Sequence, residues 1–336
     1  MASATSSAIA GFRARGIDLA PAGAVAVFLV GGAIFLLVGC LQSTNFARLT
    51  VEGLASGAVY SSLALALVLV YRASHVVNFA QGELAMLTTY VAYQLIQWGL
   101  SYWAAFAATL AVAFVLGLVL QVTLIRPVLH RSTIAAVIVT VGLFILIDGV
   151  VNWIWGGDYK VMPLPFGNGS FELGGVAITH QQVGTLAVVF ACVLLMWALF
   201  RFTKLGLGMR AAAVRPAAAS LVGVRVDRML AVGWGLAAVL GAVAGLMAEP
   251  SQLFLSPTLM QSILVYAFAA AVLGGLESPA GAVVGGLTIG VSISLVIGYV
   301  PQISSELQLP FAFLVLLIVL LVKPSGLFGR REVRRV

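Results

Sequence analysis

The sequence predicts an all-α fold, a polytopic transmembrane helix bundle of about ten spans. Of the 336 residues, 62% are hydrophobic and only 9% are charged, whereas an ordinary soluble domain carries roughly 25% charged residues. The apolar residues form runs long enough to cross a hydrocarbon layer about 30 Å thick. Positive charge gathers in the short segments between these runs and near the two ends of the chain. A water-soluble surface cannot be built from this composition, so the bundle is expected to face lipid.

Ten apolar runs, broken by arginine, proline and polar clusters, predict the spanning helices. The first run, 22–41, follows Arg13 and Arg15 and ends near Cys40, an order that a lipoprotein signal peptide also shows. Its length of about 20 residues suits a spanning helix and exceeds a typical signal core. The other predicted spans are 50–71, 78–97, 102–125, 133–155, 182–200, 229–248, 261–276, 280–298 and 310–322.

The distribution of lysine and arginine predicts the orientation, because cytoplasmic loops keep an excess of positive charge. With the N-terminus inside and an even number of spans, only Arg48 and Lys160 of the 18 basic residues fall outside. Both termini are therefore expected in the cytoplasm. The chain divides into a disordered extension at 1–20, a transmembrane domain at 21–328 and a basic cytoplasmic tail at 329–336. Basic residues placed in this way favour a lipid surface over nucleic acid as their partner.

Two halves of five spans each would have opposite orientations, as the inverted-topology repeats of many transporters do. The sequence shows no residue-level repeat between the halves, so the repeat is predicted from the topology alone. Glycines four residues apart place two notches on one helix face and predict close packing of a neighbouring helix. Four such pairs occur: Gly53/Gly57, Gly241/Gly245, Gly281/Gly285 and Gly286/Gly290.

A first polar stretch, from Asn78 to Glu83, interrupts the apolar sequence. It places Asn78, Gln81 and Glu83 beside the flexible Gly82. Ionisable groups at membrane depth usually face a cavity or a charged partner. Two interpretations stay open: Glu83 pairs with Arg72 or His75 as a structural clamp, or the stretch is a broken helix that borders a solute pathway.

A second stretch, 273–281, separates two apolar runs with Gly274, Gly275 and Glu277 and ends at the helix-stopping Pro279. By itself it is a tight turn. Together with Asn78–Glu83 it gives one interrupted segment in each half, which is typical of a transporter's central site. The predicted pathway residues are Asn78, Gln81, Gly82, Glu83, Gly274, Gly275 and Glu277.

The longest predicted cytoplasmic loop, 201–228, contains a short helix between Pro216 and Gly223, since proline suits a first helical turn and glycine the position past the end. This helix could lie against anionic headgroups or fit a groove on a cytosolic protein. The residues selected here are Arg210, Arg215, Pro216, Ala219, Ser220 and Gly223.

Several kinds of chemistry have no sequence signal. His75, His130 and His180 lie in different loops without metal-ligand spacing, so no metal site is predicted. Asp148, within the span 133–155, is interpreted as a buried hydrogen-bonding residue or a proton carrier. The chain lacks a phosphate-binding G-x-x-x-x-G-K-[ST] motif, so energy from ATP would come from another polypeptide. No cofactor and no catalytic residue is predicted in this chain.

Three motifs in order resemble the LivH-like membrane permeases of ATP-binding-cassette importers for branched-chain amino acids. They are Asn78–Glu83, Arg210–Arg228 and Ala271–Ala282, and the resemblance covers about residues 48–328. It implies a permease subunit of a bacterial cytoplasmic (inner) membrane importer that works by alternating access and is not itself an enzyme. It assigns Pro216–Gly223 as the coupling helix that docks on the ATPase, although Arg215 and Ala217 stand where the family commonly has a polar or acidic residue.

The resemblance also implies partners: cytoplasmic ATPase subunits that use ATP and Mg²⁺, a second homologous permease, and an extracytoplasmic substrate-binding protein. Related members serve urea or short amides, so a permease for those solutes is one alternative. A proton-coupled secondary transporter, with Glu83 and Asp148 as titratable groups, is another and would need no ATPase. A passive channel is weaker, because the chain lacks an obvious filter sequence.

Overall fold

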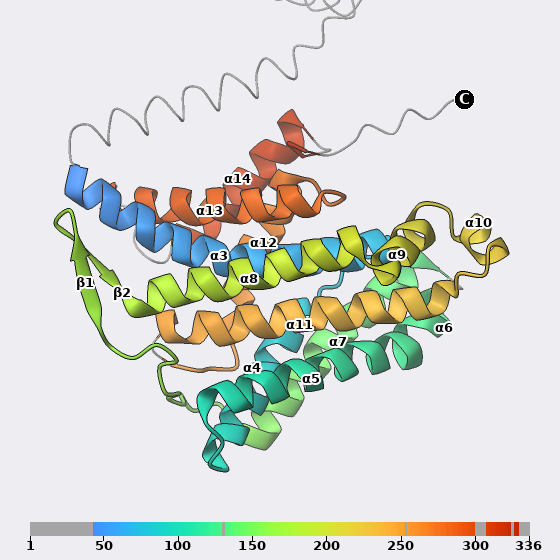
Figure 1. Cartoon of the computed structure of the whole chain (residues 1–336), viewed down its shortest axis with the longest axis horizontal. Helices are drawn as coiled ribbons and strands as arrows, with labels where there is room; N and C mark the ends of the chain where they lie inside the picture. The colour runs from blue at the N-terminus through green and yellow to red at the C-terminus, as the bar shows by residue number, and fades with distance from the viewer. Residues whose placement is uncertain (1–42, 130–131, 253, 300–306, 324–325, 329–336) are drawn as a thin grey trace, which may run out of the picture.

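The computed structural model describes residues 43–129, 132–252, 254–299, 307–323 and 326–328 as a helical bundle (Figure 1). The predicted first span 22–41, the extension 1–20 with Arg13 and Arg15, Cys40 and the basic tail 329–336 lie outside these residues. The nine other predicted spans each correspond to a helix. These are α3 (Ser43–Ser74), α4 (Gln81–Gln97), α5 (Tyr102–Leu120), α7 (Thr133–Trp155), α8 (His180–Phe202), α11 (Val226–Gln252), α12 (Leu259–Gly274), α13 (Pro279–Tyr299) and α14 (Gln308–Val322).

Six described helices are long and apolar enough to cross a membrane: α3, α5 with its continuation, α7, α8, α11 and α13. The helices α12 and α14 are apolar but shorter, and α4 has 17 residues with several polar side chains. The all-α multi-pass fold is thus confirmed, while ten remains an approximate count of spans. After α5 come a π-helical turn, η1 (Gln121–Ile125), and α6 (Arg126–Leu129).

The bundle has two distinct ends (Figure 1). One, which we call the basic end, carries α6, the C-terminus of α8 and the two short helices α9 (Lys204–Val214) and α10 (Pro216–Leu221). The opposite end, the hairpin end, carries a two-stranded antiparallel hairpin, β1 (Ser170–Leu173) and β2 (Val176–Thr179). The hairpin was not predicted: β1 alternates polar and apolar residues, but each strand has only four residues, and every position of β1 is exposed.

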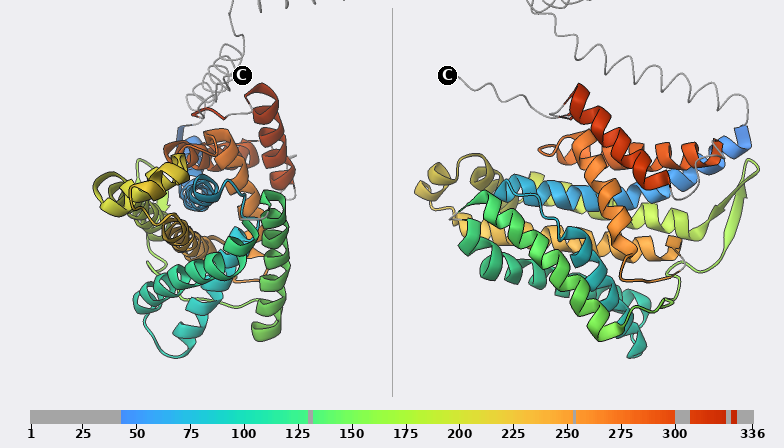
Figure 2. Two further views of the ribbon diagram at one scale, coloured as in Figure 1. Left: turned by 90° about the vertical axis from the view of Figure 1, so that its right-hand side faces the viewer. Right: turned by 180° about the vertical axis from the view of Figure 1, so that it is seen from behind.

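The arrangement of the helices supports the predicted inverted repeat. Figure 2 shows α3 and α11 through the middle of the bundle, with α13 on the outer side of α3 and α5 on the outer side of α11. In the same way α12 packs on α3, and α4 packs on α11. Exchanging each helix of the first half for its counterpart in the second half reproduces these contacts. The central position of α3 and α11 agrees with their burial: 83% of the most apolar stretch of α3 and 78% of that of α11 are buried inside the bundle.

The glycine pairs predicted to allow close packing do so. A Cβ atom added at Gly57 would lie 2.9 Å from the carbonyl oxygen of Gly286, and one added at Gly53 would lie 2.6 Å from the Cα of Val291. Ser61 seals the same seam, because its hydroxyl donates to the carbonyl of Val283 at 2.8 Å. The backbones of α3 and α13 therefore touch over several turns, and only small side chains fit between them.

Candidate functional site

Both polar stretches follow a helix end, but only the first re-enters the bundle. After α3 ends at the basic end, residues 75–80 turn back, and α4 begins level with Ala237, near the middle of α11. Asn78 organises this turn: its Oδ1 accepts from the amide of Ala80 at 3.1 Å, and its Nδ2 donates to Oε1 of Gln81 at 3.0 Å. The Nε2 of Gln81 then donates to the carbonyl of Ala237 at 2.9 Å. Both side chains are buried, so this network fixes the start of α4.

The matching feature in the second half is the segment 254–258, which leads from α11 at the hairpin end to the start of α12. The amide of Leu259 donates to the carbonyl of Ser256, just as the amide of Gln81 donates to the carbonyl of Asn78. A Cβ at Gly82 would lie 3.3 Å from the carbonyl of Met260, so α4 and α12 start side by side. From there α4 runs towards the hairpin end and α12 towards the basic end.

The two starts meet on a local two-fold axis. Ser62 of α3 donates through Oγ to the carbonyl of Leu240 of α11, and the two residues are 178 positions apart. The same offset relates Asn78 to Ser256, and Gly82 to the Met260 that it contacts. Residues that contact their own counterpart lie on the axis that relates two repeats. The contacts between counterpart residues therefore show the inverted repeat, although the two halves differ in sequence.

Glu83 lies at this axis and is 1% exposed. Neither carboxylate oxygen has a hydrogen-bond partner among the residues that the structure describes. The side chain of Gln261, which is its counterpart at the same offset, and that of Asp148 are within electrostatic reach. The predicted clamp from Glu83 to Arg72 or His75 is therefore not formed. The remaining interpretation, a broken helix at the centre of the bundle, fits the geometry.

The second stretch lies elsewhere. Gly274, Gly275 and Glu277 form the turn between α12 and α13, which lies towards the basic end, about 24 Å along α12 from its start. Position 275 favours glycine because its φ is +97°, in the left-handed region. The amide of Phe328 donates to the carbonyl of Gly274 at 3.1 Å. The structure thus brings Asn78, Gln81, Gly82 and Glu83 together but leaves the three residues of the second stretch apart from them. The pathway role of all seven residues stays a prediction.

Two further acids take different places. Asp148, interpreted from the sequence as a buried hydrogen-bonding residue or a proton carrier, is only partly buried, and its Oδ1 accepts from Nδ2 of Asn152 at 3.3 Å. Glu249 is 2% exposed and lies near the backbone of Met162. The sequence interpretation missed Glu249 because the charge and the following Pro250 suggested the end of a span, whereas α11 continues to Gln252.

The predicted short helix at the basic end is present as α10 and begins with Pro216. Gly223 follows it with a φ of +85°. Ala219 is buried, so this side chain holds α10 in place and is not available to a partner. Leu221 and Val222, in contrast, are 88% and 78% exposed. Of the other residues selected in this region, the exposed ones are Arg215, Pro216 and Ser220, while Arg210 is partly buried.

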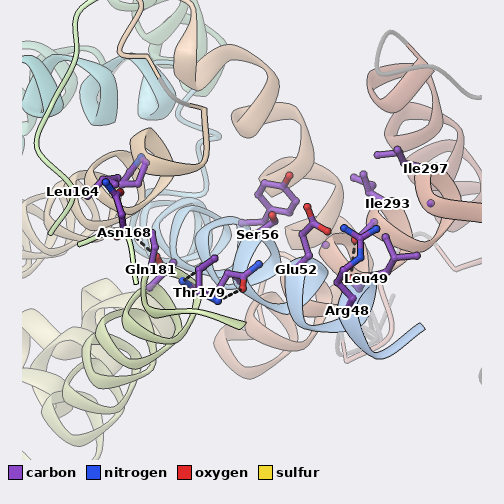
Figure 3. Close-up of a pocket in the computed structure, with 18 of the residues that line it drawn as sticks. Arg48, Leu49, Glu52, Ser56, Leu164, Asn168, Thr179, Gln181, Ile293 and Ile297 are labelled. Atoms are coloured by element: carbon purple, nitrogen blue, oxygen red, sulfur yellow. Dashed lines mark hydrogen bonds between the residues drawn. The ribbon is translucent and has the colours of Figure 1, made fainter. Parts of the chain in front are cut away.

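A cavity of about 650 Å³ lies at the hairpin end between α3, α8 and α13 (Figure 3). Its polar lining includes Arg48, Glu52 and Gln181, and its apolar lining includes Ile293 and Ile297. The sequence pointed to none of these residues as a site, because the cavity is formed by α3, α8 and α13, which are far apart in the chain. Among the described residues, no group of three or more histidine, cysteine, aspartate or glutamate side chains could hold a metal ion.

The network at the start of α4 gives a direct stability prediction. Replacing Gln81 with alanine leaves the Asn78 amide and the Ala237 carbonyl without their partner, and should lower the free energy of unfolding by about 2 kcal/mol. Chemical unfolding of the detergent-solubilised chain measures this. Gln97→Ala, at the exposed end of the same helix, should change little. Equal stabilities of the two variants would contradict the network's role.

The similarity to known proteins extends over most of the chain. Residues 49–320 match the family model described as the permease component of branched-chain amino acid transport systems. The high-affinity branched-chain amino acid transport system permease protein LivH of Salmonella typhimurium is 30% identical over 309 residues, covering 88% of this chain and 99% of that protein. LivH of Escherichia coli is 30% identical over 310 residues with the same coverage. The corresponding protein BraD of Pseudomonas aeruginosa is 30% identical over 308 residues, 87% of this chain and 98% of its own length.

Proposed function

Because this chain belongs to the family of permease components of branched-chain amino acid transport systems, we propose that it carries branched-chain or related amino acids across the bacterial inner membrane. Its relatives are permease subunits and not enzymes. The chain acts as the membrane-spanning permease subunit of an ATP-binding-cassette importer. Hydrolysis of ATP with Mg²⁺ belongs to a separate subunit.

One observation carries the proposed transport mechanism: two short helices, α4 and α12, start side by side inside the bundle and run to opposite ends. Helices interrupted at the membrane midplane, one in each inverted half, are the usual setting of a transport site. Because the two halves are related by a two-fold axis, a movement that opens one end has a counterpart that opens the other. Alternating access follows from this symmetry with the site near Glu83 as its centre.

The basic end supplies the contact for the ATPase. The exposed Leu221 and Val222 are the last residue of α10 and the residue after it, and apolar side chains at this exposure outside the bundle favour a protein partner. We therefore assign α10 as the coupling helix. The basic end then faces the cytoplasm, where positive charge is retained, and both termini lie on that side.

The hairpin end faces away from the cytoplasm in this orientation and would receive the substrate-binding protein. A second homologous permease would complete the pathway. It would contact one of the exposed apolar faces of the bundle. The exposed apolar side chains of α7 and α14 provide two such faces, with Ile138 at 65% and Leu317 at 54% exposure.

The test is purification of the tagged chain from membranes in mild detergent, followed by an ATPase assay of the proteins that accompany it. We expect a nucleotide-hydrolysing subunit, and ATP-dependent leucine uptake after reconstitution with the binding protein. Recovery of this chain alone, with uptake driven by a pH gradient, would contradict the proposal and favour a proton-coupled transporter centred on Glu83. Uptake of urea or acetamide in preference to leucine would leave the importer class intact and replace the substrate.

A further inference from the structure

The cavity at the hairpin end extends along α3, which contributes residues from Arg48 to Tyr60 to its lining. It is about 650 Å³ in volume, within the range of about 300 to 1,000 Å³ typical of small-molecule sites. Its lining along α3 begins at Arg48, near the start of the helix at the hairpin end, and reaches Tyr60. Twelve helical residues separate them, a length of about 18 Å. The cavity therefore leads from the hairpin end towards the level at which α4 and α12 begin.

Two opposite charges, Arg48 and Glu52, stand side by side in the lining. Arg48 and Glu52 are one helical turn apart on α3, so they project from the same face with their Cβ atoms about 6 Å apart. Figure 3 shows both side chains on the cavity side of the helix. Within the described part of the chain neither forms an ion pair. An arginine that precedes a glutamate by four residues has the less favourable order for a pair within one helix, which leaves both groups available to a ligand.

The walls next to these charges are apolar. Leu49 of α3 and Ile293 of α13 are 7% and 6% exposed, and Ile297 lies one turn beyond Ile293. Across the cavity, Gln181 of α8 supplies a polar wall, with its side-chain amide donating to Thr185 at 3.4 Å. The cavity thus combines one positive group, one negative group and an aliphatic surface within the length of a small molecule.

We propose that this cavity binds a zwitterionic α-amino acid with an aliphatic side chain before it enters the centre of the bundle. Arg48 holds the α-carboxylate, Glu52 holds the α-ammonium group, and Ile293 and Ile297 contact the side chain. This inference rests on the proposed transport of amino acids and deepens it, because it gives the permease its own selectivity. A neutral solute such as urea would leave both charges unpaired, so the cavity discriminates against it.

Binding to the purified full-length chain in lipid nanodiscs, without ATPase or binding protein, tests the site. Saturation-transfer NMR, which detects weak binding, measures the dissociation constant of L-leucine. Two analogues with one charge each serve as probes: isoamylamine lacks the carboxylate, and 4-methylpentanoate lacks the ammonium group. We expect leucine to bind about tenfold or more tightly than either analogue, since each charged hydrogen bond contributes that much.

The variants separate the two charges. Arg48→Gln should weaken leucine binding about tenfold and leave isoamylamine unchanged, whereas Glu52→Gln should weaken leucine and leave 4-methylpentanoate unchanged. Asp158→Asn is the matched control, because Asp158 lies near the same end, does not line the cavity, and has a side chain that is 91% exposed and pairs with Lys160. It should bind leucine as the unaltered chain does. These crossed effects would not arise from a merely structural role of Arg48 and Glu52.

Two results would overturn the inference: no leucine binding by the unaltered chain, or equal losses for leucine and both analogues in each variant. Co-purification of the ATPase with Arg48→Gln and Glu52→Gln reports separately on the proposed function. A chain that recovers its ATPase but does not bind leucine refutes only the site. A chain that binds leucine and recovers no ATPase refutes the importer and keeps the site.

Discussion

Replacing Leu221 and Val222 with aspartate is expected to abolish ATP-driven uptake while the chain stays folded in the membrane. These side chains are 88% and 78% exposed, so a charge at either position has no packing to disturb within the chain. An apolar anchor buried at a protein interface costs about 2 kcal/mol or more when it is lost, and a desolvated charge costs further. The double variant should therefore lose its ATPase subunit on purification and lose uptake by about 100-fold.

Leu173→Asp is the control for that experiment. Leu173 is 67% exposed and lies on β1 at the opposite end of the bundle, so it tests whether an acidic residue at any exposed leucine has the same effect. Its ATPase should be recovered in full. Normal uptake by the double variant at Leu221 and Val222 would contradict the assignment of α10 as the coupling helix.

A leucine at Gly57 is expected to prevent the bundle from folding. The added Cβ atom would lie 2.9 Å from the Gly286 carbonyl oxygen and equally close to the Cα of Leu287. Both are backbone atoms, which cannot rotate away as a side chain can. Overpacking typically costs 1–3 kcal/mol where side chains adjust, and we expect about 4 kcal/mol or more here, measured as loss of a monodisperse species after solubilisation.

Gly142→Leu provides the comparison. Gly142 is also within a long apolar helix, α7, but nothing lies within 4 Å of the Cβ position. It is exposed on the chain described here, so the larger side chain should be accepted and the thermal unfolding temperature should hardly change. If both variants were equally stable, the contact between α3 and α13 would not be the tight seam that we describe.

The positions of the spans could be predicted because they depend on composition, which is local. The nine predicted spans within the described residues each correspond to a helix. Errors occur where a local signal points the wrong way: Glu249 and Pro250 suggested the end of a span, yet both continue α11. The extra helix α9 was missed because its glycines and basic residues suggested a loop.

The centre of the site was half predictable. Asn78–Glu83 has three strongly polar side chains in an apolar setting, and that signal correctly marked a broken segment. Its counterpart, 254–258, carries no charge, and its polar residues are small. The glycine-rich turn at 273–281 therefore gave the stronger signal, although it lies elsewhere. The match between the halves lies in helix packing and in contacts such as Ser62 with Leu240, and no comparison of residue types could reveal it. The cavity near Arg48 depends on three helices and was likewise out of reach.

The difference between Glu83 and its counterpart Gln261 at the axis has a genetic consequence. In an assembly of two identical chains, every residue on the symmetry axis faces a copy of itself. A glutamate there would oppose a second glutamate inside the membrane, and two like charges at such a depth are strongly unfavourable. Joining both halves in one reading frame removes that constraint, because a mutation in one half no longer appears in the other. A fused gene can therefore encode a carboxylate on one side of the axis and an amide on the other. A homodimer of half-length proteins cannot, because both sides carry the same residue.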